Sequence, residues 1–249
     1  MGNKRTRDRQ LAKQAAQRRQ QRNIERRKRQ ATILTGLGIG LFAIVIVVLA
    51  FTVVGDDDPS PSAASAGCPD RTPEKPGGEK EAYPAPPPMT IDPTKSYSAT
   101  METSMGTIEL DLLASGAPVT VNSFVFLSCE GFYDGLTFHR IVPDFVIQGG
   151  DPAGDGSGGP GYQFENEQPE GETYDGGGIL AMANSGVDTN GSQFFITLAK
   201  SDALTPDLYT IFGRVTEGQK VVDEIADVPL KGETPVDPVT IDSITITES

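Results

Sequence analysis

The run of residues 31–55 constrains this chain more than any other feature, because it contains no charged side chain. As a helix, this run, which includes GLFAIVIVVLAFTVV, is long enough to cross a hydrocarbon core of about 30 Å. A buried helix of a small domain rarely lacks a polar face over such a length. We therefore predict one transmembrane helix at 31–55. A cleaved signal peptide is the alternative, since Ala64, Ser65 and Ala66 form a small-x-small pattern.

The charge of the chain is divided by this run. Residues 1–30 carry a net charge of +10 and the 219 residues that follow carry −23, which gives −13 overall. The cluster RNIERRKRQ precedes the run and DDD follows it, so the positive-inside rule predicts a cytoplasmic arm at 1–30 and an extracytoplasmic remainder in the cell membrane. Basic arms can also bind nucleic acid, but this arm has no interleaved aromatic side chain, and we expect no nucleic-acid partner.

Residues 56–95 have the composition of a tether. Pro, Ser, Ala, Gly and charged residues predominate there, and the segment has no periodic apolar pattern that could be buried. Prolines favour extended polyproline geometry, so we expect a semi-rigid spacer that holds residues 96–249 away from the bilayer.

Short alternating segments after the tether predict a mainly β domain over residues 96–249. YSATMET and GTIELDLL flank a turn at 104–106 and predict a hairpin. We expect two helices, one capped by Thr120 and ended before Gly131, and one at 218–225. Many short strands with only two helices favour a closed eight-stranded antiparallel barrel, since closure removes exposed strand edges. The other strands are predicted at 137–142, 145–148, 179–183, 193–198, 210–215 and 239–247.

The two cysteines fall in different segments, Cys68 in the tether and Cys129 near the end of the first predicted helix. Outside the cytoplasm they could form a disulfide. Such a bond would close a loop of about 60 residues and stabilise the fold by roughly 4 kcal/mol on the chain-entropy model. Two independent thiols are the alternative, and the sequence does not decide between them.

Two long blocks bring polar side chains into apolar segments. FHRIVPDFVIQGGD, Phe138–Asp151, holds the only histidine, His139, followed by Arg140 and later by Gln148. MANSGVDTNGSQFFIT, Met182–Thr197, brings amides and glycines into a second apolar segment. A plain core strand would not be interrupted in this way.

The same blocks exclude several classes of enzyme. A single histidine disfavours zinc hydrolysis and a Ser-His-Asp relay, because zinc sites need further His or Cys ligands and the relay needs a neighbouring nucleophile. The spacing of Asp151 and Asp155 does not fit a calcium-binding loop. We therefore predict no metal and no cofactor.

Both blocks resemble the cyclophilin family of peptidyl-prolyl cis-trans isomerases, and the resemblance extends over roughly 97–248. It implies a cyclophilin-like barrel and an isomerase that acts on X-Pro bonds. Arg140 matches the catalytic arginine of the family motif, and Tyr209 falls where many relatives have histidine. By the same match, the proline pocket would be walled by Phe145, Val146, Phe195 and Leu204, and the peptide backbone would be held by Gln148, Ala183, Asn184 and Gln193. Tyr209 would also bind the substrate, because it keeps an aromatic wall and a polar tip.

Isomerisation needs a site that binds the twisted amide better than either planar isomer. The barrier of about 18 to 20 kcal/mol is mostly lost amide resonance. An arginine suits this task, because its guanidinium stays charged and holds its donors in a rigid fork. Without the resemblance, Phe145, Val146 and Phe195 would be interpreted as core residues and His139 as a hydrogen-bonded structural histidine.

We predict a membrane-anchored peptidyl-prolyl isomerase that acts on proline-containing polypeptides folding outside the cytoplasm, where slow X-Pro isomerisation limits folding. The alternative is a membrane-anchored module without catalysis that holds a proline-containing partner in the same groove. Arg140 distinguishes the two, because a pure binder has little use for a donor that favours the twisted amide.

Overall fold

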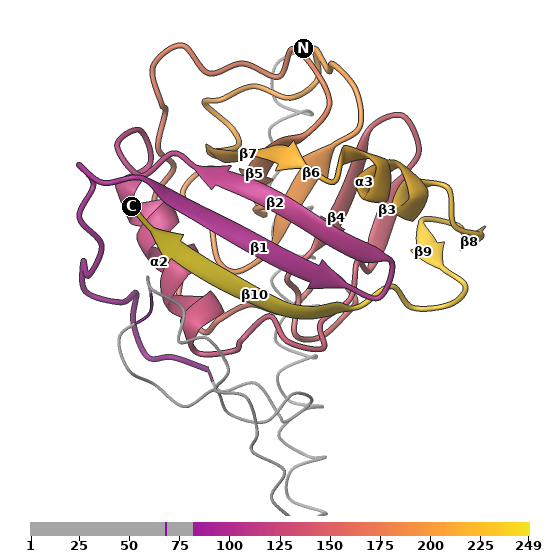
Figure 1. Cartoon of the computed structure of the whole chain (residues 1–249), viewed down its shortest axis with the longest axis horizontal. Coiled ribbons are helices and arrows are strands. Elements are labelled where there is room, and N and C mark those ends of the chain that lie inside the picture. The colour runs from indigo at the N-terminus through magenta and orange to yellow at the C-terminus, as the bar shows by residue number, and fades with distance from the viewer. Residues whose placement is uncertain (1–67, 69–81) are drawn as a thin grey trace, which may run out of the picture. The chain divides into compact units, whose positions relative to one another are not determined.

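The computed structural model describes Cys68 and residues 82–249 (Figure 1). The predicted basic arm, the predicted transmembrane helix and most of the predicted tether lie outside these residues. Within the described part of the chain, no helix is long and apolar enough to cross a membrane.

Eight strands form one antiparallel sheet in the order β10-β1-β2-β7-β5-β6-β4-β3. Each of the eight strands overlaps a segment that was predicted to be a strand. The predicted hairpin is confirmed, with Tyr97 opposite Leu112 and Thr103 opposite Gly106. The strands are β1 (Tyr97–Thr103), β2 (Gly106–Leu112), β3 (Arg140–Val142), β4 (Val146–Gly149), β5 (Ile179–Met182), β6 (Phe194–Thr197), β7 (Ile211–Glu217) and β10 (Ile241–Glu248), and a separate small hairpin is formed by β8 (Leu230–Lys231) and β9 (Thr234–Pro235).

The prediction of a closed barrel was wrong, because β3 and β10 do not pair and the sheet is a half-barrel. The chain before β3 approaches β10 through turns at Gly131 and Gly135, which both have positive φ, instead of as an extended strand. A few backbone hydrogen bonds connect the two edges. The N–H of Phe138 donates to the carbonyl of Val239 at 3.0 Å, and the N–H of Gly135 donates to that of Ile241 at 2.7 Å.

The two predicted helices are present as α2 (Pro118–Cys129) and α3 (Gln219–Ala226). Proline suits the first turn of α2, where a backbone N–H would lack a partner. The predicted cap at Thr120 was wrong, because this residue lies inside the first turn. Its N–H and hydroxyl donate to the carboxylate of Glu167 at 2.8 and 2.7 Å. A negative charge at this end complements the helix dipole.

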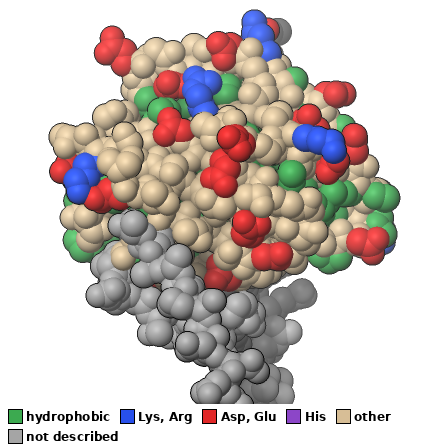
Figure 2. All heavy atoms as spheres, in the orientation of Figure 1, with side chains coloured by type: hydrophobic (Ala, Val, Ile, Leu, Met, Phe, Trp, Pro, Cys, Tyr) green, Lys and Arg blue, Asp and Glu red, His purple; other side chains and the backbone are tan. Residues whose placement is uncertain are grey.

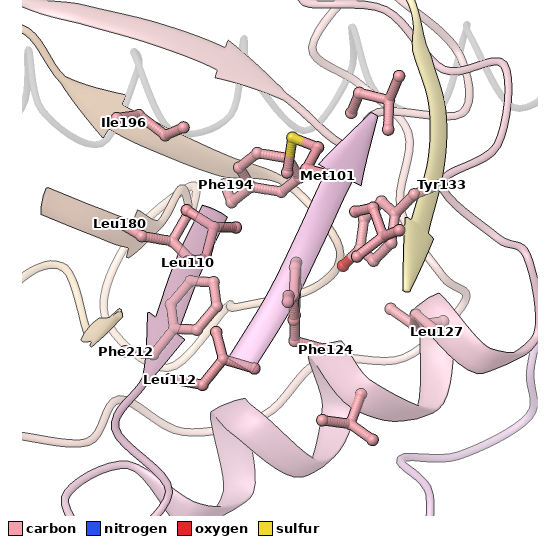
Figure 3. Packing of buried hydrophobic residues seen from close by; sticks show 14 of the residues in the cluster. Met101, Leu110, Leu112, Phe124, Leu127, Tyr133, Leu180, Phe194, Ile196 and Phe212 are labelled. Atoms are coloured by element: carbon pink, nitrogen blue, oxygen red, sulfur yellow. The ribbon is translucent and has the colours of Figure 1, made fainter. Parts of the chain in front are cut away.

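The main core lies between α2 and the sheet (Figure 3). Phe124 on α2 contacts Tyr133 and Phe212, with ring centroids 5.3 Å apart in both pairs. Tyr133 also meets Phe194 on β6 edge to face at 5.7 Å. Aromatic pairs of this geometry stabilise a core beyond the area they bury.

The central strands have two buried faces. Successive side chains of a strand point to opposite faces, so Ile147, Leu180, Phe194 and Phe212 belong to the main core. The residues next to them along the strands point to the other face, where they form a second, smaller cluster with Tyr174 and Leu204. This cluster is called the apolar cluster below. It contains Val146, Tyr174, Ile179, Ala181, Phe195, Leu204 and Ile211, with Leu113, Phe145, Ala183 and Tyr209 packed against it.

Cys68 and Cys129 form a disulfide, with their Cα atoms 5.4 Å apart, which confirms the paired alternative. Residues 82–91, although expected to belong to a spacer, lie on the domain. Asn122 of α2 accepts the N–H of Thr90 at 2.8 Å and donates to the carbonyl of Pro88 at 3.0 Å. The part of this segment that precedes β1 is therefore hydrogen-bonded to α2.

Acidic side chains are spread over the face formed by β10, β1 and β2, with few basic ones among them (Figure 2). This distribution agrees with the strongly negative charge of the chain after residue 30. A negative field of this kind attracts basic polypeptides and repels acidic ones.

Candidate functional site

Strand register places Arg140 at one end of a row of side chains that crosses four strands. Arg140 on β3 is opposite Gln148 on β4, and Gln148 is opposite Phe195 on β6. Phe195 is in turn opposite Ala181 on β5. Directly opposite residues share one face of a sheet. The row therefore joins a cation, an amide and an apolar surface on the face that lies away from the main core.

The guanidinium of Arg140 is held from two sides. Its Nη1 donates to Gln148 Oε1 at 3.2 Å, and its Nε donates to Glu233 Oε2 at 2.7 Å. The side chain still keeps 37% of its surface exposed. The guanidinium is thus held in one orientation and remains accessible to a ligand.

Amide side chains continue this network away from the arginine. Gln148 Nε2 donates to Gln193 Oε1 at 2.9 Å. Gln193 Nε2 donates to the carbonyl of Gly158 at 2.9 Å and to that of Gly156 at 3.1 Å. Residues 156–162, called the glycine-rich loop below, are therefore connected to Arg140 through two glutamines.

A polar hollow lies beside these amides. Gln148, Asn184 and Gln193 line one part of it, and the loop 156–160 with Tyr162 lines another. Asn184 is oriented by donation from Nδ2 to the carbonyl of Leu208 at 2.8 Å. Side-chain amides and backbone groups therefore line the hollow, and both can form hydrogen bonds with a peptide.

The apolar cluster is built around Phe195, which is 4% exposed. Tyr174 stacks on this ring at 6.2 Å, and Tyr209 meets it edge to face at 5.8 Å. Phe145 and Tyr209 are only half-buried, so an apolar surface remains open beside the arginine row. Ala183 belongs to this surface and also lines the polar hollow, so the two parts adjoin.

The structure brings the ten predicted site residues into one region. Three form the hydrogen-bonded chain, six form or contact the apolar cluster, and Asn184 lines the polar hollow. Their roles in binding and catalysis stay predictions. The chain is Arg140, Gln148 and Gln193, and the residues of or at the cluster are Phe145, Val146, Ala183, Phe195, Leu204 and Tyr209.

His139 differs from the expectation of a hydrogen-bonded histidine. It is buried, and among the described residues neither ring nitrogen has a hydrogen-bond partner of normal geometry. Burial is the main cause that lowers the pKa of its imidazole, with a smaller opposing effect from Asp151. Across the described residues, no group of three or more His, Cys, Asp or Glu is arranged to hold a metal.

Sequence reasoning missed Tyr174 and Glu233. Glu233 lies between β8 and β9, 93 residues after Arg140, and no local pattern connects the two. Tyr174 lies in an irregular segment before β5, where strand periodicity gives no signal. Both partners could be identified only once the fold had brought distant segments together.

Comparison with known proteins places this geometry in a family. The family described as "Cyclophilin type peptidyl-prolyl cis-trans isomerase/CLD" matches residues 98–246. The mouse (Mus musculus) peptidyl-prolyl cis-trans isomerase-like 1 is 48% identical over an alignment of 159 residues, and the match covers 62% of this chain and 93% of the mouse protein. Peptidyl-prolyl cis-trans isomerase A of Mycobacterium tuberculosis is 44% identical over an alignment of 176 residues, and the match covers 64% of this chain and 96% of that protein.

Comparison with solved structures indicates the same family. The crystal structure of a Cryptosporidium parvum cyclophilin type peptidyl-prolyl cis-trans isomerase matches with a TM-score of 0.59 at 35% identity, covering 62% of this chain and 99% of that chain. A structure of the same protein in the presence of the dipeptide Ala-Pro matches with a TM-score of 0.58.

Proposed function

Because the chain belongs to the cyclophilin family and is a peptidyl-prolyl cis-trans isomerase, we propose that it accelerates X-Pro isomerisation in polypeptides folding outside the cytoplasm, with Arg140 as the catalytic residue. The observation that carries this proposal is the row of Arg140, Gln148 and Phe195, which sets a fixed cation beside an apolar surface. An X-Pro segment needs this pairing, since its ring is apolar and its amide is polar.

Binding of the substrate begins at the apolar cluster. The proline ring contacts Phe195, with Phe145 and Tyr209 beside it, because these rings offer the apolar surface next to the arginine row. The Ala-Pro dipeptide used with the Cryptosporidium parvum relative supports a ligand of this size. The flanking peptide then lies over the polar hollow, where Asn184 and Gln193 bind its backbone.

Catalysis follows from what changes as the amide twists. Resonance is lost, so the prolyl nitrogen becomes pyramidal and gains a lone pair that accepts a hydrogen bond. Arg140 then donates to this nitrogen more strongly than in either planar isomer, which lowers the barrier selectively. No bond is broken and no proton is transferred. Each 1.4 kcal/mol of selective stabilisation raises the rate about tenfold.

The holding contacts make the arginine an effective donor. Gln148 and Glu233 fix the guanidinium from two directions before the substrate arrives. Donors that are already oriented need no reorganisation when charge develops, so they stabilise a transition state better than mobile ones. The peptide-binding groups restrain the segment while the proline side rotates.

We place the isomerase domain outside the cytoplasm, anchored by a span at 31–55. The Cys68–Cys129 disulfide supports this location, since such bonds persist in oxidising compartments. The charge asymmetry around the uncharged run supports the same orientation. A C-terminal fusion to alkaline phosphatase, which is active only outside the cytoplasm, is expected to be active in intact cells. An active cytoplasmic reporter at the same position would refute the orientation.

The catalytic proposal is tested with a refolding protein whose slow phase is limited by an X-Pro bond. The full-length chain should accelerate this phase, and Arg140→Ala should lose about 100-fold or more of the acceleration. Arg214→Ala is the matched control, because Arg214 is also a partly exposed arginine on a strand but pairs with Glu172. No acceleration by the folded wild type would favour the alternative, a module that binds proline-containing partners without catalysis.

A further inference from the structure

Tyr83 lies in close backbone contact with the glycine-rich loop. Its N–H donates to the carbonyl of Pro160 at 2.8 Å. Gly161 has a φ of +93°, and a Cβ at this position would lie 2.6 Å from the carbonyl oxygen of Tyr83. Only glycine allows both the left-handed backbone and this approach. The loop is therefore shaped to receive the chain at Tyr83.

The ring of Tyr83 is held between α2 and the same loop. Its centroid lies 5.0 Å from that of Phe126 on α2, in an edge-to-face contact. Phe132 and Tyr162 are also neighbours, at 6.4 and 6.5 Å. Tyr162 is in turn hydrogen-bonded to Ser123 of α2 at 2.9 Å. The aromatic group thus joins the helix, the N-terminal segment and the loop.

The loop that Tyr83 supports forms a wall of the polar hollow. Gly158, Pro160 and Tyr162 line it together with the site amides Gln148, Asn184 and Gln193. Gln193 donates to the carbonyl of Gly158 and accepts from Gln148, which accepts from Arg140. A continuous set of contacts therefore runs from Tyr83 to the catalytic side chain.

The segment that carries Tyr83 is attached to the domain on both sides along the sequence. Before it, Cys68 is bonded to Cys129 at the end of α2. After it, Thr90 and Ile91 donate to Asn122 Oδ1 at 2.8 and 3.3 Å. Tyr83 precedes residues 98–246, which match the family, so its contact with the loop is an addition to the domain that the family model describes.

We propose that Tyr83 is a positioning residue for the peptide site, which fixes the loop 158–162 and thereby sets the affinity for the residues that flank the proline. This inference rests on the proposed isomerase function. The loop binds the flanking peptide and does not contact the twisting amide, so its order affects substrate and transition state alike. Such a uniform effect changes KM and leaves kcat nearly unchanged.

The test uses the purified full-length chain in mild detergent and a peptide series with residues on both sides of an X-Pro bond. Tyr83→Ala should raise KM roughly fivefold with kcat changed by less than about twofold. Tyr83→Phe keeps the ring contact with Phe126, so its KM should lie closer to that of wild type than to that of Tyr83→Ala. Met89→Ala is the matched control, since Met89 lies in the same segment and is exposed.

Hydrogen exchange gives a second readout that does not depend on activity. In Tyr83→Ala, the backbone N–H groups of residues 158, 159, 161 and 162 should exchange faster while those of β1 and β2 keep their protection. Unchanged KM and unchanged loop exchange would overturn the proposal, and so would faster exchange throughout the domain, which would reveal a general loss of stability. An inactive wild type with faster loop exchange only in the variant would refute the isomerase function and leave the positioning contact established.

Discussion

Glu233 binds the strand of Arg140 through two groups at once. Its carboxylate accepts a hydrogen bond from Arg140 Nε at 2.7 Å, and its backbone carbonyl accepts the N–H of Ile141, also at 2.7 Å. The backbone contact fixes where the carboxylate lies relative to β3. The hairpin between β8 and β9 therefore acts as a support for the guanidinium.

Replacing Glu233 should reduce catalysis with little effect on stability. Glu233→Ala removes the acceptor at Nε, and we expect kcat/KM to fall about tenfold because the donor must be oriented during the reaction. Glu233→Gln keeps an acceptor and should show a smaller loss. The exposed pair should contribute no more than about 1 kcal/mol to the free energy of unfolding. Steady-state kinetics on both variants check this, with Glu224→Ala, which removes the partner of Lys220 on α3, as the control.

Stability should fall as the pH drops below about 7, partly because of His139. Burial lowers the pKa of this imidazole below its usual 6.5 in the folded state. The unfolded chain therefore binds the proton first, and by linkage the folded state loses relative stability as the pH falls through 6.5 towards the lowered value. Urea unfolding at several pH values should show a weaker pH dependence for His139→Gln. An unchanged slope in this variant would contradict the assignment.

The disulfide should stabilise the fold by restricting the unfolded chain. Cys68 and Cys129 are 61 residues apart, and the chain-entropy model gives roughly 4 kcal/mol for such a loop. We expect reduction, or replacement of both cysteines by serine, to lower the free energy of unfolding by about 2 to 4 kcal/mol. Urea titration with and without reductant measures this difference. Equal midpoints of urea unfolding in the two conditions would show that the disulfide does not increase the free energy of unfolding.

The carboxylate of Glu167 should support the first turn of α2. It accepts the N–H groups of Val119 and Thr120 at 3.0 and 2.8 Å. Glu167→Ala leaves these donors without their partner, and we expect a loss of about 1 to 2 kcal/mol in the free energy of unfolding. Glu170→Ala provides a nearby exposed comparison that should stay within about 0.5 kcal/mol of wild type.

Elements with strong local patterns could be predicted from the sequence. The alternation in 97–112 predicted the β1–β2 hairpin, and both helices were predicted close to their observed positions. The cap of α2 was predicted wrongly, because the partner of its first turn is Glu167, which is remote in sequence. Closure of the sheet was also predicted wrongly, since the approach of β3 to β10 depends on turn geometry at Gly131 and Gly135.

In the site too, residues within one local motif could be predicted, and residues from distant segments could not. Arg140 and Gln148 occur in one motif, and their opposition across β3 and β4 follows from a short strand pair. Glu233 and Tyr174 reach the site from segments without periodicity, so no local pattern indicates them. Residues whose role depends on contacts between distant segments become visible only in the folded structure.

The most direct test of the central claim is the rate of cis-trans exchange in a bound Ala-Pro-containing peptide, measured by NMR exchange spectroscopy with wild type and Arg140→Ala. We predict rapid exchange on the wild-type protein, and exchange slower by about 100-fold on a variant that still binds the peptide. Equal exchange rates on the two proteins at equal occupancy would contradict the account, because Arg140 would then contribute to neither orientation nor stabilisation of the twisted amide.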